Sequence, residues 1–337
     1  MRTRLVAASL LTLFASVATA AAAPVAFTYT GAFQTFTVPT DGRYDVLAFG
    51  AQGGTGRFIS TPPPGGRGAE IGGDFHLIAG ERLRIAVGGV GSNTPSAANR
   101  LQGGGGGGGS FVVLQGAMPQ PLVIAGGGGG GGSDGTGRQA DGQTGIVGQN
   151  GFADFGDAPN GGGTNGAGGF GPGGGGFISS GGAESDTSPV LGGGSFPDGL
   201  GGGAASGASN GGFGGGGGAS SYYAGGGGGY SGGGTGVCGI GCGSGGGGSF
   251  DGGANQVLVA GFNSGNGLVV ITELPTAPVP EPASLAIFGG GLLGLQTLLR
   301  RRADRVLPIG WLYRVGLEGP RAVVACNRNA LCRTSIG

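Results

Sequence analysis

Few residues in this sequence have the type and spacing needed for chemistry. His76 is its single histidine, and it lies in a strand-like stretch without cysteine or acidic partners at the spacing of a zinc site. Ser-His-Asp catalysis would need the same residue, and no G-x-S-x-G nucleophile elbow precedes a helix. We therefore expect no enzyme activity, no metal site and no cofactor, and a structural or surface position for His76.

The cysteines offer a different kind of chemistry. Cys238 and Cys242 are separated by three residues in a glycine-rich stretch. Two thiolates alone make a poor metal site, whereas in an exported protein they suit a disulfide that closes a small loop. Four aspartates between glycine runs leave weak calcium binding open, although the nonapeptide period of calcium β-helices is missing.

Aromatic side chains between the glycine runs are the leading candidates for ligand binding. Tyr222, Tyr223 and Tyr230 combine an apolar ring with a polar hydroxyl, which suits a sugar or protein ligand. The phenylalanines in the same setting are Phe170, Phe177 and Phe213. The alternative interpretation is that these rings anchor the glycine segments onto a β-sandwich.

The composition is far from that of an ordinary enzyme. Glycine supplies 94 of the 337 residues, roughly four times its usual share, and only 10% of residues are charged. The chain has no lysine, which excludes a Walker A nucleotide site and a protein-kinase domain. Residues 25–275 hold 7 arginines and 14 acidic residues, so their formal charge is 7 − 14 = −7. We therefore expect no nucleic-acid partner, because such binding depends on basic residues that neutralise phosphates.

The N-terminus has the order of a secretory signal peptide. Arg2 and Arg4 precede an apolar stretch at 5–17, and small residues follow at 18–23. The apolar stretch is too short to span about 30 Å of hydrocarbon as a helix. We predict a signal helix that is removed by cleavage within 20–23, so that residues 1–23 are the signal peptide.

A second targeting segment lies at 276–302. Its parts, in order, are the tripeptide Pro280, Glu281 and Pro282, an apolar run at 283–299, and the cluster Arg300, Arg301 and Arg302. The apolar run is about 25 Å long as a helix, which spans a locally thinned membrane. The arginines mark the cytoplasmic flank of this transmembrane helix. The order of the three parts resembles the PEP-CTERM sorting signal of Gram-negative bacteria that make exopolysaccharide.

This resemblance implies a partner and a route. In that family an exosortase-type enzyme is thought to process the tail in the inner membrane and pass the protein outward. The tripeptide is then the recognition element, and the arginines stop transfer. Residues 303–337 depart from the family, whose signals end soon after the arginines. This basic tail is either a non-native extension or a genuine cytoplasmic segment, and a genuine segment would put sorting in doubt.

Residues 24–275 form the predicted extracellular domain. Short stretches alternate apolar and polar residues with the period of two that is typical of half-buried strands, as in Val25, Phe27 and Tyr29. The further candidate strands are 33–38, 43–49, 69–78, 82–87, 110–115, 121–125, 256–260 and 267–273. No amphipathic helix pattern appears. We therefore predict an all-β fold, an antiparallel sandwich or jelly-roll-like module.

Glycine runs separate these strands. Residues 101–255 hold 68 of the 94 glycines, and the longest runs are 103–109 and 126–132. The absence of a Gly-X-Y period excludes collagen. A glycine run is either a flexible linker or part of a packed array of extended threefold helices that bond to one another. We favour packed polyglycine-II-type helices, because the runs begin and end on buried-type residues such as Phe111 and Ile124.

Several motifs of this domain occur together in a known family. They are 27–31, 34–39, 50–54, 122–125, 224–233 and 263–271. Together they resemble the glycine-rich domain of the anaplastic lymphoma kinase and leukocyte tyrosine kinase receptors, which is also found in bacterial surface proteins. The resemblance implies a β-sandwich that carries packed polyglycine helices and binds protein ligands. No ligand-contact motif transfers to this chain.

These observations predict an exported cell-surface or exopolysaccharide-matrix protein with a structural or adhesive role, sorted by an exosortase-type system. The alternative is a receptor-like surface module that binds a protein or polysaccharide ligand, with Tyr222, Tyr223 and Tyr230 as its binding face. A secreted hydrolase is disfavoured, because no catalytic constellation is present.

Overall fold

The computed structural model describes residues 23–57, 62–95, 102–132, 140–152, 160–184, 190–205, 209–221, 223–237, 243–275 and 295. The predicted signal helix lies outside these residues, and so does the predicted membrane helix at 283–299 apart from Leu295. Within the described part, no helix has the length and apolar character that crossing a membrane requires. The chain divides after Ala277 into two units, and the fold given below is that of the first.

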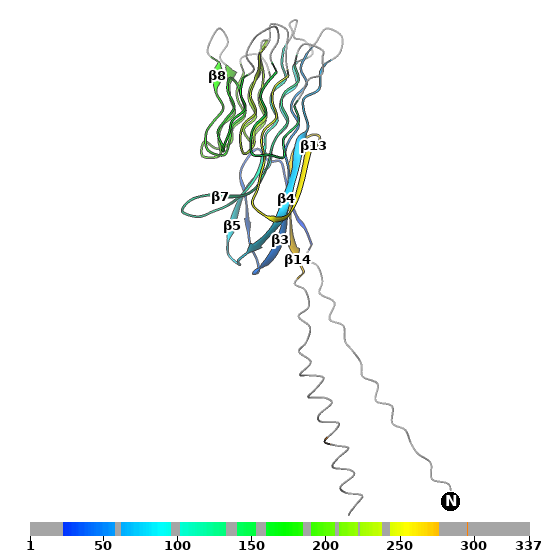
Figure 1. Ribbon diagram of the computed structural model, residues 1–337, viewed down its shortest axis with the longest axis vertical. Coiled ribbons are helices and arrows are strands. Elements are labelled where there is room, and N and C mark those ends of the chain that lie inside the picture. The colour runs from blue at the N-terminus through cyan, green and yellow to red at the C-terminus, as the bar shows by residue number, and fades with distance from the viewer. Residues whose placement is uncertain are drawn as a thin grey trace, which may run out of the picture. The chain divides into compact units, whose positions relative to one another are not determined.

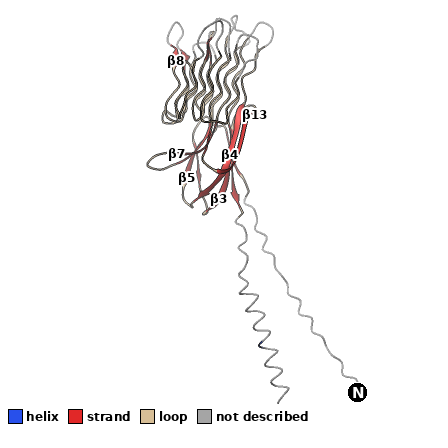
Figure 2. Ribbon diagram, viewed as in Figure 1, coloured by secondary structure: helices blue, strands red, loops and turns tan. Residues whose placement is uncertain are grey.

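Two five-stranded antiparallel sheets pack face to face (Figures 1 and 2). In spatial order, sheet A consists of β1 (Val25–Thr28), β14 (Leu268–Leu274), β3 (Gly42–Phe49), β4 (Gly68–Leu77) and β13 (Ala254–Asn263). Sheet B consists of β12 (Phe250–Asp251), β7 (Gln120–Ala125), β6 (Ser110–Leu114), β5 (Arg82–Ala86) and β2 (Gln34–Thr37). Two short pairs lie outside the sandwich, β8 (Ala183–Glu184) with β9 (Val190–Leu191) and β10 (Tyr223–Ala224) with β11 (Gly236–Val237).

The sandwich core follows from the period of two along each strand. In β3, the side chains of Tyr44, Val46 and Ala48 are buried, while their neighbours Asp45 and Leu47 lie on the outer face. Branched residues from both sheets complete the core, among them Ile71, Leu83, Ile85, Val112, Val123 and Ile271. The prediction of an all-β antiparallel fold is confirmed, and the strand boundaries differ from the predicted ones mainly by a few residues.

The glycine segments between the strands pack against one another beyond one end of the sandwich (Figure 1). We call this part of the module the glycine array; it comprises 50–57, 62–67, 87–95, 102–109, 126–132 and the described residues of 140–249. Figure 2 shows that its segments are neither helix nor strand, apart from the short strand pairs. The array begins at the end of sheet B. Ser110 pairs with Ala125 in the β6–β7 hairpin, so the glycine runs 103–109 and 126–132, which adjoin these two residues, begin side by side.

Backbone hydrogen bonds in the array repeat every three residues. In the run 103–109, successive N–H groups donate to three different neighbouring segments, and every third residue returns to the same one. The bonds to the first neighbour run Gly103 to Ser220, Gly106 to Gly217 and Gly109 to Gly214. Those to the second run Gly104 to Gly131 and Gly107 to Gly128, and those to the third run Gly105 to Ser92 and Gly108 to Gly89.

The carbonyl groups of the same run accept from further segments. Gly104 and Gly107 accept from Gly225 and Gly228, and Gly105 and Gly108 accept from Gly54 and Ala51. Gly106 accepts from Gly212. The run 103–109 thus lies among six neighbours, and the backbone groups of 104–108 are paired with backbone groups alone.

Close approach explains why these positions are glycine. A Cβ atom on Gly106 would overlap the carbonyl oxygen of Gly226, and one on Gly130 would overlap that of Gly104. None of the glycines 103–109 has a φ in the left-handed region. Glycine is therefore required here for space between backbones, not for its conformational freedom.

Buried hydroxyl groups complete this backbone network. Ser249 Oγ accepts from the N–H of Gly126 (2.9 Å) and donates to the carbonyl of Gln143. Ser231 Oγ donates to the carbonyl of Ile146 (2.6 Å). These serines are fully buried, so each stands in for a backbone partner where one segment ends or turns.

Candidate functional site

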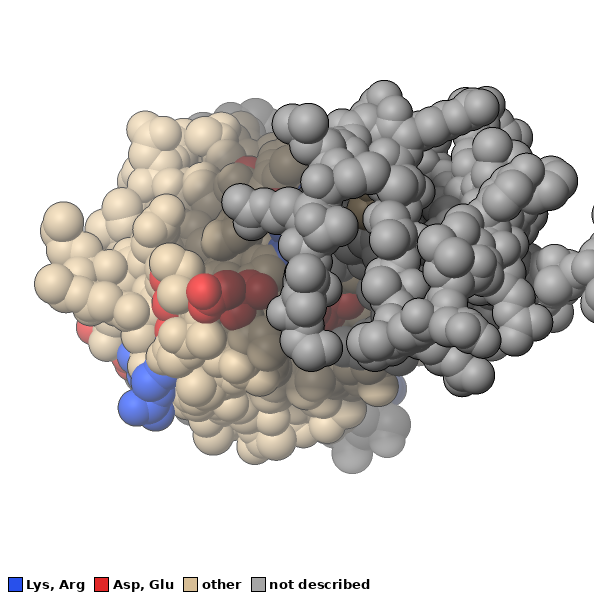
Figure 3. Space-filling view, turned by 90° about the horizontal axis from the view of Figure 1, so that it is seen from below, with Lys and Arg blue, Asp and Glu red and all other residues tan. Residues whose placement is uncertain are grey.

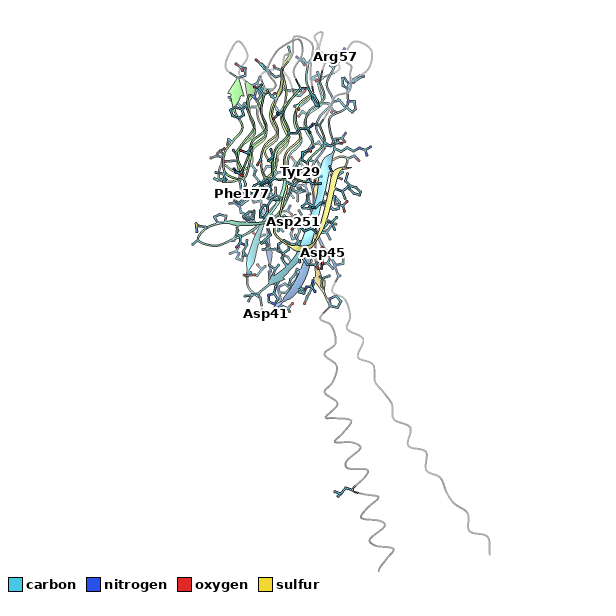
Figure 4. All side chains as sticks on the ribbon, viewed as in Figure 1. Tyr29, Asp41, Asp45, Arg57, Phe177 and Asp251 are labelled. Atoms are coloured by element: carbon cyan, nitrogen blue, oxygen red, sulfur yellow. The ribbon has the colours of Figure 1, made fainter. Side chains whose placement is uncertain are left out.

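A row of aromatic rings lies where the outer face of sheet B meets the glycine array. Its members, in order of contact, are Phe213, Phe33, Phe196, Phe177, Tyr230 and Phe250, with successive ring centroids 6.1, 5.5, 5.2, 6.1 and 5.0 Å apart. We call this set the aromatic row. Phe196 is buried and the other rings are half-buried. Figure 4 shows Phe177 at this junction.

Two parts of the fold bring these rings together. The outer face of sheet B supplies a buried apolar floor, made of Ala86, Phe111, Val113 and Ile124. Segments of the array contribute Phe177, Phe196, Phe213 and Tyr230, which pack on that floor. Phe33 comes from the β1–β2 loop and Phe250 from β12. Phe196, for example, packs on Phe111 with 6.1 Å between centroids. The row therefore joins the sandwich to the array, and this contact supports the anchoring interpretation of Phe177, Phe213 and Tyr230.

The turn that carries Phe196 is held by a carboxylate. Asp198 Oδ2 accepts hydrogen bonds from the hydroxyls of Ser180 and Ser195, both at 2.6 Å. The bond from Ser180, then that from Ser195, lowers the pKa of Asp198 below its ordinary value. The charged form of Asp198 therefore fixes the turn.

Arg84 lies against the row. Its Cζ atom is 3.5 Å from the ring centroid of Phe33 and 5.2 Å from that of Phe196, a cation–π arrangement. The side chain is half-buried. The single ion pair within the described residues joins Arg43 to Asp74, so no described carboxylate neutralises Arg84. A planar guanidinium with free N–H donors suits a carboxylate or another planar anion.

Polar side chains lie around Arg84 on the same outer face. Thr35 is its direct neighbour on β2, and the pair Thr37 and Arg82 lies two residues along the strands. All three are exposed. Together with the half-buried rings, they form a basic surface with apolar and hydroxyl neighbours, which can bind an anionic ligand that also has apolar faces.

The outer face of sheet A has the opposite charge. Asp45 and Asp74 are direct neighbours across β3 and β4, and burial, followed by the charge of Asp74, raises the pKa of Asp45. Burial also raises the pKa of Glu70 on the same face. Figure 4 labels Asp45 among the strands of sheet A, and the view from below in Figure 3 shows both acidic and basic side chains on the visible surface. The two outer faces of the sandwich thus differ in charge.

The predicted site residues have different outcomes. Tyr230 lies in the aromatic row, while Tyr223 lies apart from the row, half-buried in β10. Tyr222, the Cys238 and Cys242 pair, and the sorting residues 280–282 and 300–302 lie outside the described residues. Phe170 is 65% exposed and makes no ring contact with another described aromatic residue. A shared binding face of Tyr222, Tyr223 and Tyr230 therefore stays a prediction.

Sequence reasoning missed Phe33, Phe196 and Arg84. Arg84 alternates with Leu83 and Ile85, which marks it as an outer-face residue but says nothing of its ring neighbours. His76 is exposed on the outer face of β4, where it lies opposite Arg43 of β3 in the strand register. Among the described residues, no group of three or more His, Cys, Asp or Glu is arranged to hold a metal ion.

No curated protein matches the chain. The protein-family model described as the PEP-CTERM protein-sorting motif matches residues 278–302. This motif implies export, membrane-associated processing and sorting to the surface by an exosortase-type system.

Proposed function

We propose that this chain is a structural or adhesive protein of the cell surface or exopolysaccharide matrix of a Gram-negative bacterium. The observation that carries the proposal is the sorting motif at 278–302, which implies delivery to the surface. In this role Pro280, Glu281 and Pro282 are the residues that the exosortase-type enzyme recognises. Arg300, Arg301 and Arg302 hold the apolar segment in the membrane before processing.

The glycine array supports a mechanical role without enzyme activity. Its backbone bonds link the run 103–109 to six neighbouring segments, most of them far away in sequence, as between Gly107 and Gly128 or Gly228. The period of three residues supports the assignment of polyglycine-II helices, which have three residues per turn and no internal hydrogen bonds. It also fits the proposed kinship with the glycine-rich domain of the two receptor kinases. We take the array to be a rigid spacer within the surface module.

Mapping the ends of the mature protein tests the sorting role. Intact mass and terminal peptides would be compared between the surface fraction and the membrane fraction of the native host. We expect a surface species that starts within 20–23 and ends close to 280–282. An uncut membrane species that keeps residues 303–337 would contradict sorting and favour an anchored module with a real cytoplasmic tail.

The aromatic row with Arg84 favours a second candidate function, a surface module that binds an anionic polysaccharide or protein ligand. Arg84 is held 3.5 Å from the Phe33 ring and has no carboxylate partner among the described residues. A uronate-bearing glycan has the chemistry that this surface would recognise, because carboxylates pair with guanidinium and sugar C–H faces pack on rings.

Affinity electrophoresis in gels containing polygalacturonate tests this candidate. The Arg84→Lys variant keeps the charge but loses the planar guanidinium, and Arg67→Lys, at an exposed arginine of the glycine array outside this surface, is the control. Binding that falls about tenfold in Arg84→Lys and stays within twofold in Arg67→Lys would support a site at Arg84. Equal mobility of all forms in gels with and without the glycan would contradict binding of this glycan, and the structural role would remain as the proposed function.

A further inference from the structure

The last strand of sheet A, β13, has an unusual free edge. It lies at the end of the strand order, and among the described strands it pairs only with β4 (Figure 1). Residues 254–260 are all exposed, although they belong to a sheet. Four of its large apolar side chains are exposed, Val257 (39%), Leu258 (47%), Val259 (41%) and Phe262 (53%).

The other free edges of the sandwich are much shorter. The edge strands β1, β12 and β2 have 4, 2 and 4 residues, whereas β13 has 10. Natural proteins protect free edges with short strands, charges, prolines or bulges. β13 contains no charged residue and no proline. Its pairing with β4 is irregular on both sides of Val257–Val259, so this regular centre remains as a template for another strand.

A second copy of this chain fits this edge. β13 contains no charged residue and its centre is apolar, so an identical strand can pair with it without bringing charges of the two strands together. The nearby carboxylate of Asp74 is already engaged by Arg43 Nη2 (2.8 Å) and by Asn255 Nδ2 (2.7 Å).

We propose that β13 pairs with β13 of a second copy, in antiparallel register centred on Leu258. This register places Val257 of one copy opposite Val259 of the other, on the same face of a continuous sheet. Since β4 places Gly72 beside Val257 and Glu70 beside Val259, each Glu70 shares its row with Gly72 of the second copy. Each of these rows then contains a single carboxylate, so no two like charges lie in the same row.

The pairing would be weak in dilute solution. A strand pair buries less than the roughly 1,600 Å² of a standard stable interface. It therefore forms where copies are concentrated, as at a cell surface or in a matrix. The inference depends on the sandwich alone, so its failure would leave sorting and the role of Arg84 untouched.

A charge-complementation experiment tests both the interface and its register. The full chain in mild detergent would be examined by sedimentation velocity over a hundredfold concentration range. We expect a concentration-dependent dimer that Val257→Lys alone and Val259→Glu alone each weaken about tenfold or more. The double variant Val257→Lys, Val259→Glu should regain dimerisation, because each introduced lysine faces an introduced glutamate of the other copy.

The control is Ile178→Lys, at a 62% exposed position in the glycine array, which should dimerise like the original chain. Thermal unfolding of each variant checks that the fold is kept. A monomer at every concentration would overturn the proposal. So would a dimer that all variants form equally, or single variants that weaken it without recovery in the double variant.

Discussion

The sandwich and the glycine array solve the same problem with opposite means. Each must pair its backbone polar groups away from water. In the sandwich a strand bonds to at most two neighbours, and interlocked side chains such as Ile71 and Leu83 fill the space between sheets. In the array a glycine run bonds to as many as six neighbours, and a Cβ atom at positions such as Gly106 would overlap a neighbouring carbonyl. The sandwich should therefore tolerate changes of side-chain shape, whereas the close-packed glycine positions of the array should not tolerate an added side chain.

The largest effect should come from adding one methyl group inside the array. In Gly106→Ala the new Cβ would overlap the carbonyl of Gly226, and neither backbone can move without breaking other bonds. We expect a loss of more than about 3 kcal/mol in the free energy of unfolding, or failure to fold. Urea unfolding measures it. The matched control is Gly201→Ala, because Gly201 is exposed with nothing within 4 Å and should change stability by less than about 1 kcal/mol.

The second prediction concerns shape in the sandwich core. Ile71 is fully buried, and Ile71→Ala should lower the free energy of unfolding by about 2–5 kcal/mol. The conservative change Ile71→Val should cost only about 0.5–1.5 kcal/mol. This graded response, read from the same urea curves, would distinguish the sandwich from the all-or-none array. Equal losses in both variants would contradict the comparison.

These two regions also differ in how far the sequence predicts them. The period of two in 43–49 and 82–87 identifies strands and the faces that they bury, because side chains alternate whatever their partners. The run 103–109 contains no such information: seven identical residues indicate close packing but not which segments are neighbours. Only the strands at either end, such as the β6–β7 hairpin, fix where each run starts.

The aromatic row shows the same limit at the candidate site. The sequence singled out Tyr230, Phe177 and Phe213 because they stand alone among glycines. It could not place Phe33 and Arg84 beside them, since these come from a loop and a strand more than ninety residues earlier in the chain. Residues brought together by distant pairing leave no local pattern.

The third prediction tests side chains that substitute for backbone partners in the array. Ser249→Ala would leave the buried N–H of Gly126 and the carbonyl of Gln143 without the hydroxyl that joins them. We expect a loss of about 1–3 kcal/mol, the usual cost of an unpaired buried polar group. The matched control is Ser221→Ala, a partly exposed serine in the array, which should fall within about 0.5 kcal/mol. Hydrogen exchange should show faster exchange at Gly126 in the Ser249 variant alone.

The smallest effect concerns a carboxyl at the edge of the sandwich core. Burial raises the pKa of Asp251 above its ordinary value, and its buried Oδ2 atom has no hydrogen-bond partner among the described residues. Because the folded pKa is raised, the ionised group opposes folding above that pKa. This opposition disappears as the pH falls below the ordinary carboxyl value of about 4. Asp251→Asn keeps the acceptor for the N–H of Gly253 and removes the charge. We expect its Tm to exceed that of the original chain by about 1–3 °C at pH 7, and the difference to vanish near pH 3. A lower Tm at pH 7 would mean that the carboxylate has a stabilising partner. The tolerance that we assign to the sandwich would then not extend to its edge at β12.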